Sequence, residues 1–460
     1  MAYKDFREFL DALKREGDLI EVSRAVDLDT EIGKALKQVY VKKGPAVVFT
    51  NTGKPHPLVV GVYGTRSKAL LAFQATEGNV LEKVLHGLDN PIPPTMTASA
   101  SAPCHEVILL DDKINIKDFP VPTYSPNDGG PFITPGITVS KDPVTGVPDI
   151  GHYRYQIMGE NVLSFLAQPF HRFGKNMNKA REMGKDNFEG AVVIGVDPVL
   201  AYTCQVQVTD DTNDWSVAGG LRGEPVELVK CVTVDVEVPA TAEVVIEFVV
   251  DFNTKVVEGP LGEYTGYYTP ASEKPIARIT AITHRKNPYF QGLLTGKPVT
   301  ENHILKQIPF EASFLKTMKK QFPTIHEIAI PPSGGVSFYT VISMKPRFAG
   351  EAKQAILAAM ASNIRPKWVI IVDPDIDVHD STEVEWALSF RVQPAQDVII
   401  VEKIPSGPLD PSVDEKSALG NRTMSAIGID ATRPYGVDFP IVADVPGWRE
   451  YDFPELKKTK

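Results

Sequence analysis

The sequence has little cysteine, with three in 460 residues. Cys104, Cys204 and Cys231 are odd in number and far apart, so we expect reduced thiols in a cytoplasmic protein rather than disulfides or a thiolate zinc site. No apolar run approaches the roughly 18 residues that span a bilayer. The first residues, MAYKDFREFL, carry charges that a secretory signal lacks. We therefore expect no membrane partner.

A basic block is also lacking. Lys and Arg number 48 against 58 Asp and Glu, which gives a formal net charge of −10. Proteins that bind nucleic acids usually carry a basic stripe, so we expect no nucleic-acid partner. The G-x-G-x-x-G fingerprint, the Walker A loop, the G-x-S-x-G elbow and H-E-x-x-H do not occur. Any chemistry must therefore come from scattered polar residues.

The pattern of apolar residues divides the chain into three parts and a tail. Residues 1–104 read as a small α/β unit, whose first helix covers 4–16 and which ends in a Pro- and Ser-rich linker. Residues 105–303 carry short β-branched runs between Gly and Pro turns, which predicts an antiparallel β-barrel or sandwich. Strands and helices alternate over 304–440, which predicts a parallel sheet, and 441–460 form a C-terminal tail. The fold class expected is α+β with several domains.

Polar residues gather in the middle part of the chain. In GHYRYQI (151–157), a continuous strand would place His152, Arg154 and Gln156 on one face. That face is either a solvated side of the sheet or the wall of a site in which Arg154 holds a carboxylate or phosphate. In QPFHR (168–172), the pair His171 and Arg172 favours an anion site over a structural histidine.

Two acidic segments follow. The run Asp210-Asp211-Thr212-Asn213-Asp214 is either a solvated loop or a source of hard oxygen ligands for Mg²⁺ or Mn²⁺. In Glu258-Gly-Pro-Leu-Gly-Glu263, glycine and proline permit a tight turn that brings both glutamates to one pocket. Paired carboxylates in a dry pocket repel each other, so one is kept protonated, which suits acid–base chemistry.

These segments, in this order, resemble the UbiD family of prenylated-flavin-dependent decarboxylases. The resemblance covers essentially the whole chain and includes GHYRYQI, QPFHR, AGGLRGEPVELVKC, VPATAEVVIE, EGPLGEYTGYY, RPKWVIIVDPDIDVHD and GIDAT. It implies an N-terminal α/β domain (1–104), a flavin-binding split β-barrel (105–303) and a C-terminal α/β domain (304–440) that forms homodimers or higher homo-oligomers.

The resemblance also implies site residues. The catalytic trio falls on Arg154, Glu258 and Glu263. The divalent-metal ligands, typically for Mn²⁺ with K⁺ beside it near the carbonyls of Thr203 and Cys204, fall on Asp149, His171 and Asp214. Two of these are aspartates where the family uses Asn and Glu, which puts the metal's identity in doubt, and Glu227 is read as structural. The flavin contacts fall on His152, Tyr153, Arg154, Gln168 and Arg172. A flavin-contacting Lys of the family is replaced by Ala426, with Arg422 nearby as its possible substitute.

The activity that the resemblance implies is reversible, non-oxidative loss of CO₂ from an aromatic or heteroaromatic acid of pyrrole, indole or hydroxybenzoate type. It would proceed through a covalent prenylated-FMN adduct with Glu263 as proton donor, since no side chain is an electron sink for the carbanion. Asn302 is expected either to bind the substrate or, with Thr300, to cap the helix that follows. A flavin prenyltransferase would supply the cofactor. The alternatives are cinnamate-like substrates, a carboxylase, or a flavin-binding module without activity.

Overall fold

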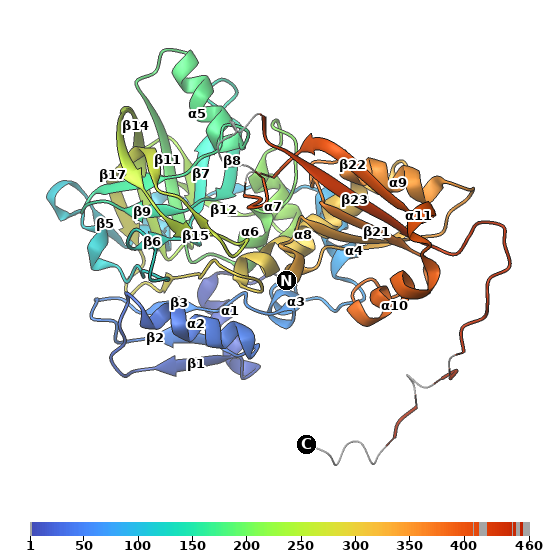
Figure 1. The fold of residues 1–460 in the computed structure, drawn as a ribbon. Coiled ribbons are helices and arrows are strands. Elements are labelled where there is room, and N and C mark those ends of the chain that lie inside the picture. The colour runs from blue at the N-terminus through green and yellow to red at the C-terminus, as the bar shows by residue number, and fades with distance from the viewer. Residues whose placement is uncertain (1, 408, 414–420, 444, 448–450, 454–460) are drawn as a thin grey trace.

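The computed structural model describes residues 2–407, 409–413, 421–443, 445–447 and 451–453, so the predicted tail, 441–460, falls partly outside the described residues. An N-terminal unit lies against a curved central sheet, and a C-terminal domain stands beside both (Figure 1). The α+β fold with several domains is therefore confirmed. Within the described ranges, no helix is both long and apolar enough to span a bilayer.

The N-terminal unit packs helices on a small sheet with the order β1-β2-β3-β18. Helix α1 begins after Asp5, whose carboxylate accepts a hydrogen bond from the Glu8 backbone N–H at 3.0 Å, and its buried face carries Phe6, Phe9 and Leu13. Strand β18 comes from much later in the chain and ties the central part to this unit. The bounds are α1 Phe6–Arg15, β1 Leu19–Val22, α2 Glu31–Val41, β2 Ala46–Phe49, β3 Leu58–Val60, α3 Arg66–Phe73, α4 Val80–Asp89 and β18 Phe290–Gln291.

The central sheet is antiparallel with the order β6-β9-β10-β17-β14-β11-β7-β8, and β5 adds to β17. It curves into a half-barrel around a cluster of buried aromatic rings from Tyr155, Phe165, Phe173 and Phe248. The bounds are β5 Val107–Leu109, β6 Phe132–Ile133, β7 Ile137–Lys141, β8 Pro148–His152, β9 Tyr155–Ile157, β10 Val162–Phe165, β11 Asn187–Ile194, β14 Val244–Glu258 and β17 Ser272–His284.

Short elements surround this sheet. A small sheet has the order β13-β12-β4, and β15 pairs with β16. The β-branched run Val232–Val238 is not one strand, because β12 and β13 form a hairpin whose turn occupies most of it. The bounds are β4 Thr95–Met96, β12 Glu227–Lys230, β13 Glu237–Pro239, β15 Leu261–Gly262, β16 Tyr268–Thr269, α5 Arg172–Glu182, α6 Pro198–Thr203 and α7 Asp214–Arg222.

The predicted continuous strand 151–157 is interrupted at Tyr153 and Arg154. Strand β8 pairs with β7 at one end of the strand order, whereas β9 pairs with β6 and β10 at the other. The chain therefore crosses from one end of the curved sheet to the other between His152 and Tyr155. Arg154 lies on this crossing, where its side chain is not fixed by strand pairing.

The C-terminal sheet has the order β19-β20-β21-β23-β22. It is mixed rather than parallel, because β19 pairs antiparallel with β20 and β22 pairs antiparallel with β23. The successive strands β20 and β21 are parallel, because the crossover helix α9 connects them. The bounds are β19 Ile325–Ala329, β20 Tyr339–Met344, α9 Glu351–Met360, β21 Trp368–Val372, α10 Ser381–Arg391, α11 Pro394–Asp397, β22 Val398–Pro405 and β23 Thr423–Ala431.

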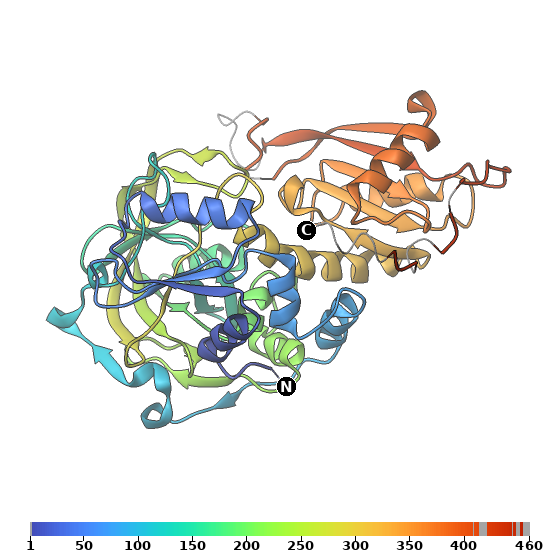
Figure 2. The ribbon, with the colours of Figure 1, turned by 90° about the horizontal axis from the view of Figure 1, so that it is seen from below.

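Helix α8 (Glu301–Lys319) joins the parts of the molecule and runs from the central region beneath the C-terminal sheet (Figure 2). Its first residue, Glu301, is fully buried and accepts hydrogen bonds from the Tyr40 hydroxyl at 2.7 Å and from the backbone N–H of Tyr63 at 2.8 Å. Its far end contributes Phe314 and Met318 to the C-terminal core. The first turns of α8 are thus held in place by the N-terminal unit.

Candidate active site

Arg154, Glu258 and Glu263, predicted to be catalytic, come together where β14 ends. Arg154 donates from Nε to Glu258 Oε1 at 3.0 Å and from Nη2 to Oε2 at 3.2 Å, and Glu258 is fully buried. The Nη1 atom of Arg154 forms an ion pair with Glu263 and lies 3.4 Å from the Thr269 hydroxyl. That hydroxyl donates to Glu263 Oε1 at 3.0 Å. One guanidinium therefore bridges two carboxylates of different exposure.

The turn between the two glutamates is held from both sides. Gly259 has φ +90°, which a residue with a side chain rarely adopts, and its N–H donates to Gln156 Oε1 at 2.8 Å. Asp128 Oδ1 accepts from the Gly262 N–H at 3.0 Å, and burial raises the pKa of Asp128. A β-carbon at Gly129 would collide with the Gly259 carbonyl. The sequence predicted a tight turn, but the roles of Asp128 and Gly129 depend on contacts across the fold.

Arg172 sits at the centre of a second cluster with two of the predicted metal ligands. Its Nη1 donates to both carboxylate oxygens of Asp214 at 2.8 Å, and its Nε lies 3.5 Å from Asp149 Oδ1. Its Nη2 donates to the carbonyls of Pro148 at 3.2 Å and Thr212 at 3.0 Å. Asp214 begins helix α7 and also accepts from the Ile150 N–H at 2.8 Å.

Both aspartates of this cluster are buried, and desolvation dominates their ionisation. Burial raises the pKa of Asp149 to about 7, although Arg172 opposes the rise, and burial also raises the pKa of Asp214. Two buried carboxylates share one guanidinium here, so a positive charge or a proton at this point is favoured.

The predicted divalent-metal site is not assembled. In the part of the chain that the structure describes, no three His, Cys, Asp or Glu side chains are grouped as metal ligands. Asp149 and Asp214 offer hard oxygens, but Arg172 holds both, and His171 is instead the N-cap of α5 with its ring edge-on to Tyr153. The Thr203 carbonyl, expected near K⁺, accepts from the Val206 N–H at 3.0 Å. Glu227 is exposed on β12.

His152 and Tyr153, two of the predicted flavin contacts, lie close to His171 in partly desolvated surroundings. Desolvation, with a smaller contribution from the Lys306 charge, lowers the pKa of both His152 and His171 to about 4, so both imidazoles are neutral at pH 7. His152 Nδ1 lies 2.7 Å from Gln205 Nε2, and neither histidine is fully buried. Tyr153 packs against Phe173. These side chains are desolvated on one side and keep exposed surface on the other, so a ligand from solvent can reach them.

Gln168 and Arg422, two other predicted flavin contacts, are held by backbone hydrogen bonds. The Gln168 carbonyl accepts from the His171 N–H at 3.1 Å, which forms the turn before α5. Ala426 is buried within β23 opposite Val401, so it offers no side chain to a cofactor. Arg422 lies just before β23, and its carbonyl accepts from the Ser406 N–H at 3.1 Å.

Lys306, which the sequence did not single out, lies on α8 beside the catalytic turn. Its Nζ is 4.0 Å from the ring centroid of Tyr264, the residue after Glu263. Burial lowers the pKa of Lys306 to about 8. A lysine among the apolar residues of the helix expected after Asn302 was the available signal, but only tertiary packing shows which way that face of α8 points.

Asn302, the predicted substrate contact, lies in the first turn of α8. Its Oδ1 accepts a hydrogen bond from the Thr300 hydroxyl, and Thr300 is the N-cap. His303 Nδ1 accepts from the Thr300 N–H at 3.1 Å, and its Nε2 lies 2.7 Å from the Tyr264 carbonyl. Burial lowers the pKa of His303 to about 4, which fits a neutral ring that donates from Nε2. The cap is thus Thr300, and the Asn302 amide nitrogen is left for another partner.

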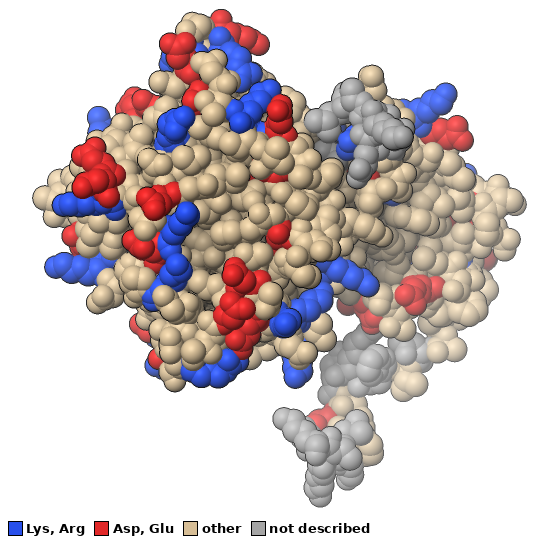
Figure 3. Space-filling view, turned by 60° about the vertical axis from the view of Figure 1, so that its left-hand side comes forward, with Lys and Arg blue, Asp and Glu red and all other residues tan. Residues whose placement is uncertain are grey.

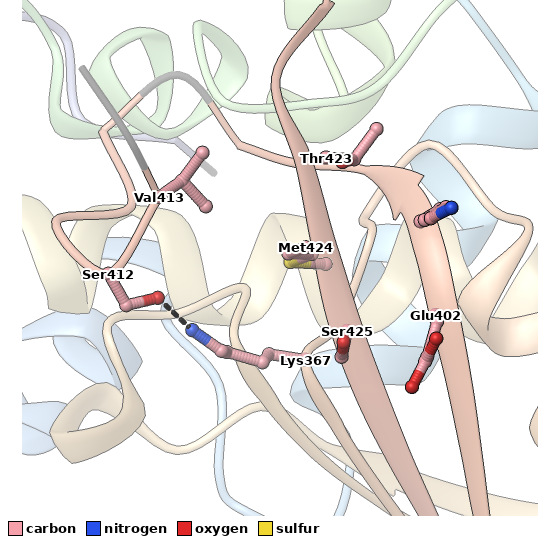
Figure 4. A pocket seen from close by; sticks show the side chains of 8 residues that line it. Lys367, Glu402, Ser412, Val413, Thr423, Met424 and Ser425 are labelled. Carbon is pink, nitrogen blue, oxygen red and sulfur yellow. Dashed lines mark hydrogen bonds between the residues drawn. The ribbon is translucent and has the colours of Figure 1, made fainter. Parts of the chain in front are cut away.

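A cavity of about 560 Å³ lies elsewhere, beside β22 and β23 in the C-terminal domain (Figure 4). Its side chains include Lys367, whose ammonium donates to Ser412 Oγ at 2.5 Å and to Asp410 Oδ2 at 2.9 Å. Arg154, Glu258 and Glu263 do not line it. On the face of the molecule in Figure 3, acidic and basic side chains are scattered among the described residues without a basic tract.

Family models match nearly the whole chain. The models describe the N-terminal domain (residues 10–88), the Rift-related domain (95–298) and the C-terminal domain (303–431) of 3-octaprenyl-4-hydroxybenzoate carboxy-lyase. A protein of Archaeoglobus fulgidus without a characterised function is 32% identical over 95% of this chain and 93% of its own length.

Solved structures agree with this match. The UbiD-class enzyme HmfF from Pelotomaculum thermopropionicum, solved in complex with FMN, is 34% identical with a TM-score of 0.89 and covers 97% of this chain and 99% of its own. An evolved dimeric form of HmfF was solved with prenylated FMN. The vanillic acid decarboxylase of Sedimentibacter hydroxybenzoicus in its open form is 29% identical, with a TM-score of 0.87 and coverage of 98% of both chains. The chain therefore belongs to the UbiD family of carboxy-lyases.

Proposed function

We propose that this protein is a prenylated-FMN-dependent decarboxylase of aromatic or heteroaromatic carboxylic acids. The observation that carries the proposal is the contact of Arg154 with both Glu258 and Glu263. A flavin-binding module needs no proton donor, so two glutamates on one arginine favour an enzyme. Structures of HmfF, which is 34% identical to this chain, and of its evolved dimeric form, which is 33% identical, contain FMN and prenylated FMN, respectively. This similarity supports the same cofactor here.

Each residue of the trio takes a distinct role in this proposal. Glu258 fixes the Arg154 side chain through two hydrogen bonds, so the guanidinium is oriented before the substrate arrives. Arg154 Nη1, which faces the more exposed Glu263, would hold the substrate carboxylate. With Arg154 balanced by Glu258, a substrate carboxylate brings a further negative charge, which favours a proton on Glu263. That proton is then delivered to the carbon that loses CO₂.

The cofactor would lie against His152, Tyr153, Arg154, Gln168 and Arg172, with Arg422 in place of the missing lysine. Prenylated FMN supplies the electron sink that the protein lacks. The neutral imidazoles of His152 and His171 suit partly desolvated surroundings. We propose no step through a divalent ion, because the oxygens of Asp149 and Asp214 are held by Arg172.

The Asn302 amide nitrogen, one turn from Lys306 on α8, would bind an acceptor on the substrate ring. We propose that the protein forms a homo-oligomer. The side chains of Phe390 and Trp386 on α10 are exposed apolar groups against which a second copy could pack. Domain borders near residues 104 and 303 belong to the same proposal, as does a flavin prenyltransferase that supplies the cofactor.

The test is an assay of the protein produced with a flavin prenyltransferase. Pyrrole-, indole-, hydroxybenzoic and cinnamic acids are incubated with it in D₂O, and CO₂ release and deuterium incorporation are measured. We expect both for at least one aromatic acid, and neither for protein loaded with FMN alone. High bicarbonate with the product should return the acid. Absence of CO₂ release and exchange from a protein that carries prenylated FMN would leave only the flavin-binding module.

A further inference from the structure

The inner face of α8 carries a positive charge without a counter-ion. Lys306 forms no ion pair with any carboxylate and no hydrogen bond among the described residues, and its contacts are the ring faces of Tyr264 at 4.0 Å and Phe310 at 5.9 Å. A buried charge is costly unless it is paired. The chain therefore keeps a cation at a place where the polypeptide does not balance it.

A second buried lysine shows how this chain balances such a charge elsewhere. Lys68 is fully buried, but its Nζ lies 3.6 Å from Asp18 Oδ1 and donates to the carbonyls of Gly44 at 2.7 Å and Gly61 at 3.2 Å. Lys306 has no equivalent of these partners. Unlike Lys68, it keeps some exposed surface, so a molecule from solvent can reach it.

The described groups around Lys306 supply no negative charge to balance it. It lies in the second turn of α8, close to the positive end of the helix dipole. The imidazoles of His152, His171 and His303 interact with its charge, and their pKa values of about 4 make them neutral at pH 7, so they neither balance nor add to the charge of Lys306. Tyr264 offers the face of its ring, and its backbone carbonyl faces His303 instead.

We propose that Lys306 binds an anionic group of a ligand at the active site, in addition to the carboxylate held by Arg154. The proposal rests on the proposed function for the identity of the ligand. Two ligands can bring the anion: the phosphate of the flavin, or a second acidic substituent on the substrate ring. Asn302, four residues before Lys306, lies on the same face of α8 and would contact the same ligand.

Equilibrium binding distinguishes the two sources without any turnover. In the first arm, FMN and riboflavin are titrated into the apo-protein by flavin fluorescence. In the second arm, benzoate and benzene-1,3-dicarboxylate are titrated into the FMN-loaded protein by calorimetry. The variants are Lys306→Met, Lys306→Gln and Lys306→Arg, and Lys319→Met on the exposed face of the same helix is the matched control.

We expect Lys306→Met and Lys306→Gln to raise the Kd of either FMN or benzene-1,3-dicarboxylate by roughly 30-fold. The Kd of the matching analogue, riboflavin or benzoate, should rise by less than about threefold. Lys306→Arg should retain the preference, and Lys319→Met should behave as the wild type. Selective loss of FMN assigns the anion to the cofactor, and selective loss of the diacid assigns it to the substrate. Equal losses within both pairs, or none, overturn the proposal. A wild-type protein that binds prenylated FMN but releases no CO₂ contradicts the proposed function alone.

Discussion

Two clusters in the central domain have the same charges but differ in how far their carboxylates are exposed. Arg154 with Glu258 and Glu263, and Arg172 with Asp149 and Asp214, each place one guanidinium between two carboxylates. In the Arg172 cluster both carboxylates are buried, and two backbone carbonyls take the remaining N–H groups. In the Arg154 cluster one carboxylate, Glu263, keeps exposed surface on a turn.

The difference lies in the elements that hold the carboxylates. Asp149 lies within strand β8 and Asp214 begins helix α7, so the backbone of each is fixed by regular structure. Aspartate side chains are also short, which limits their movement. Glu263 follows the two-residue strand β15 and has a longer side chain. The Thr269 hydroxyl accepts a hydrogen bond from Arg154 and donates one to Glu263. Because a hydroxyl can rotate, it can also donate to a different acceptor. A satisfied cluster holds structure, whereas a cluster with one accessible acid can exchange a proton with a ligand.

The largest expected effect comes from removing the centre of the accessible cluster. Arg154→Met removes the guanidinium that holds the fully buried Glu258 through two hydrogen bonds, so we expect a loss of about 3–5 kcal/mol in the free energy of unfolding and no CO₂ release. Urea unfolding and the CO₂ assay measure both. The matched control is Arg278→Met, since Arg278 is exposed on β17 and pairs with Asp251 at 3.5 Å, and its effect should stay within about 0.5 kcal/mol. A stable, active Arg154→Met protein would remove the basis of the comparison.

The next effect separates the two glutamates of that cluster. Glu263→Gln keeps the shape but cannot donate an acid proton, so CO₂ release should fall by roughly 10²- to 10⁴-fold. The free energy of unfolding should change by less than about 1 kcal/mol, because the amide oxygen of the substituted side chain can still accept from Thr269. Flavin absorbance of the purified variant checks that the cofactor remains bound. Unchanged turnover would assign the proton transfer to another group.

The Arg172 cluster should respond to metal only when its arginine is removed. Arg172→Met leaves Asp149 and Asp214 facing each other, which should cost about 3 kcal/mol of stability in metal-free buffer. Because two buried carboxylates offer hard oxygen ligands, Mn²⁺ should restore part of that loss. Chemical denaturation with EDTA or Mn²⁺ measures the difference, with Arg278→Met, which frees a single carboxylate, as the variant that Mn²⁺ should not affect. If Mn²⁺ stabilises the wild type as strongly, the metal displaces the guanidinium, and the predicted metal site forms after all.

The sequence predicted the local features of the fold better than those that depend on distant pairing. The spacing of Phe6, Phe9 and Leu13 was sufficient for α1, because helical periodicity is a local property. The break between β8 and β9 was missed, since it depends on which strands lie at each end of the sheet. The mixed C-terminal sheet was missed because β23 is inserted between β21 and β22, and strand order is not written in the alternation of elements.

The candidate site divides in the same way. The pairing of Glu258 with Glu263 on a tight turn was foreseen from the glycines, and Arg154 from the resemblance to the family. The metal site was predicted from aligned positions, which carry no information on whether Arg172 or an ion occupies the space between Asp149 and Asp214. Lys306 was missed because a lysine in a helix is usually solvated, whereas tertiary packing, which includes the ring of Tyr264, desolvates this one.

The smallest expected effect concerns Lys306 in the protein without ligand. Its pKa in the folded state is about 8, below the value of 10.5 for an unperturbed lysine, so the fold disfavours the protonated form. This penalty is fully present below pH 8 and disappears as the pH rises to about 10.5, because the unfolded chain binds the proton more tightly in that window. Lys306→Met should therefore be more stable than the wild type by on the order of 1–2 kcal/mol at pH 7.

The gap between the two proteins should close between pH 8 and pH 10.5, and urea unfolding across that range measures it. The groups that face Lys306 do not obscure the result, since His152, His171 and His303 have pKa values of about 4 and the pKa of Tyr264 is raised above 10.0 by burial. Lys319→Met, at an exposed position of α8, should show no such trend. A gap that stays constant with pH would mean that Lys306 is already balanced within the protein, in the manner of Arg172, and needs no anion from a ligand.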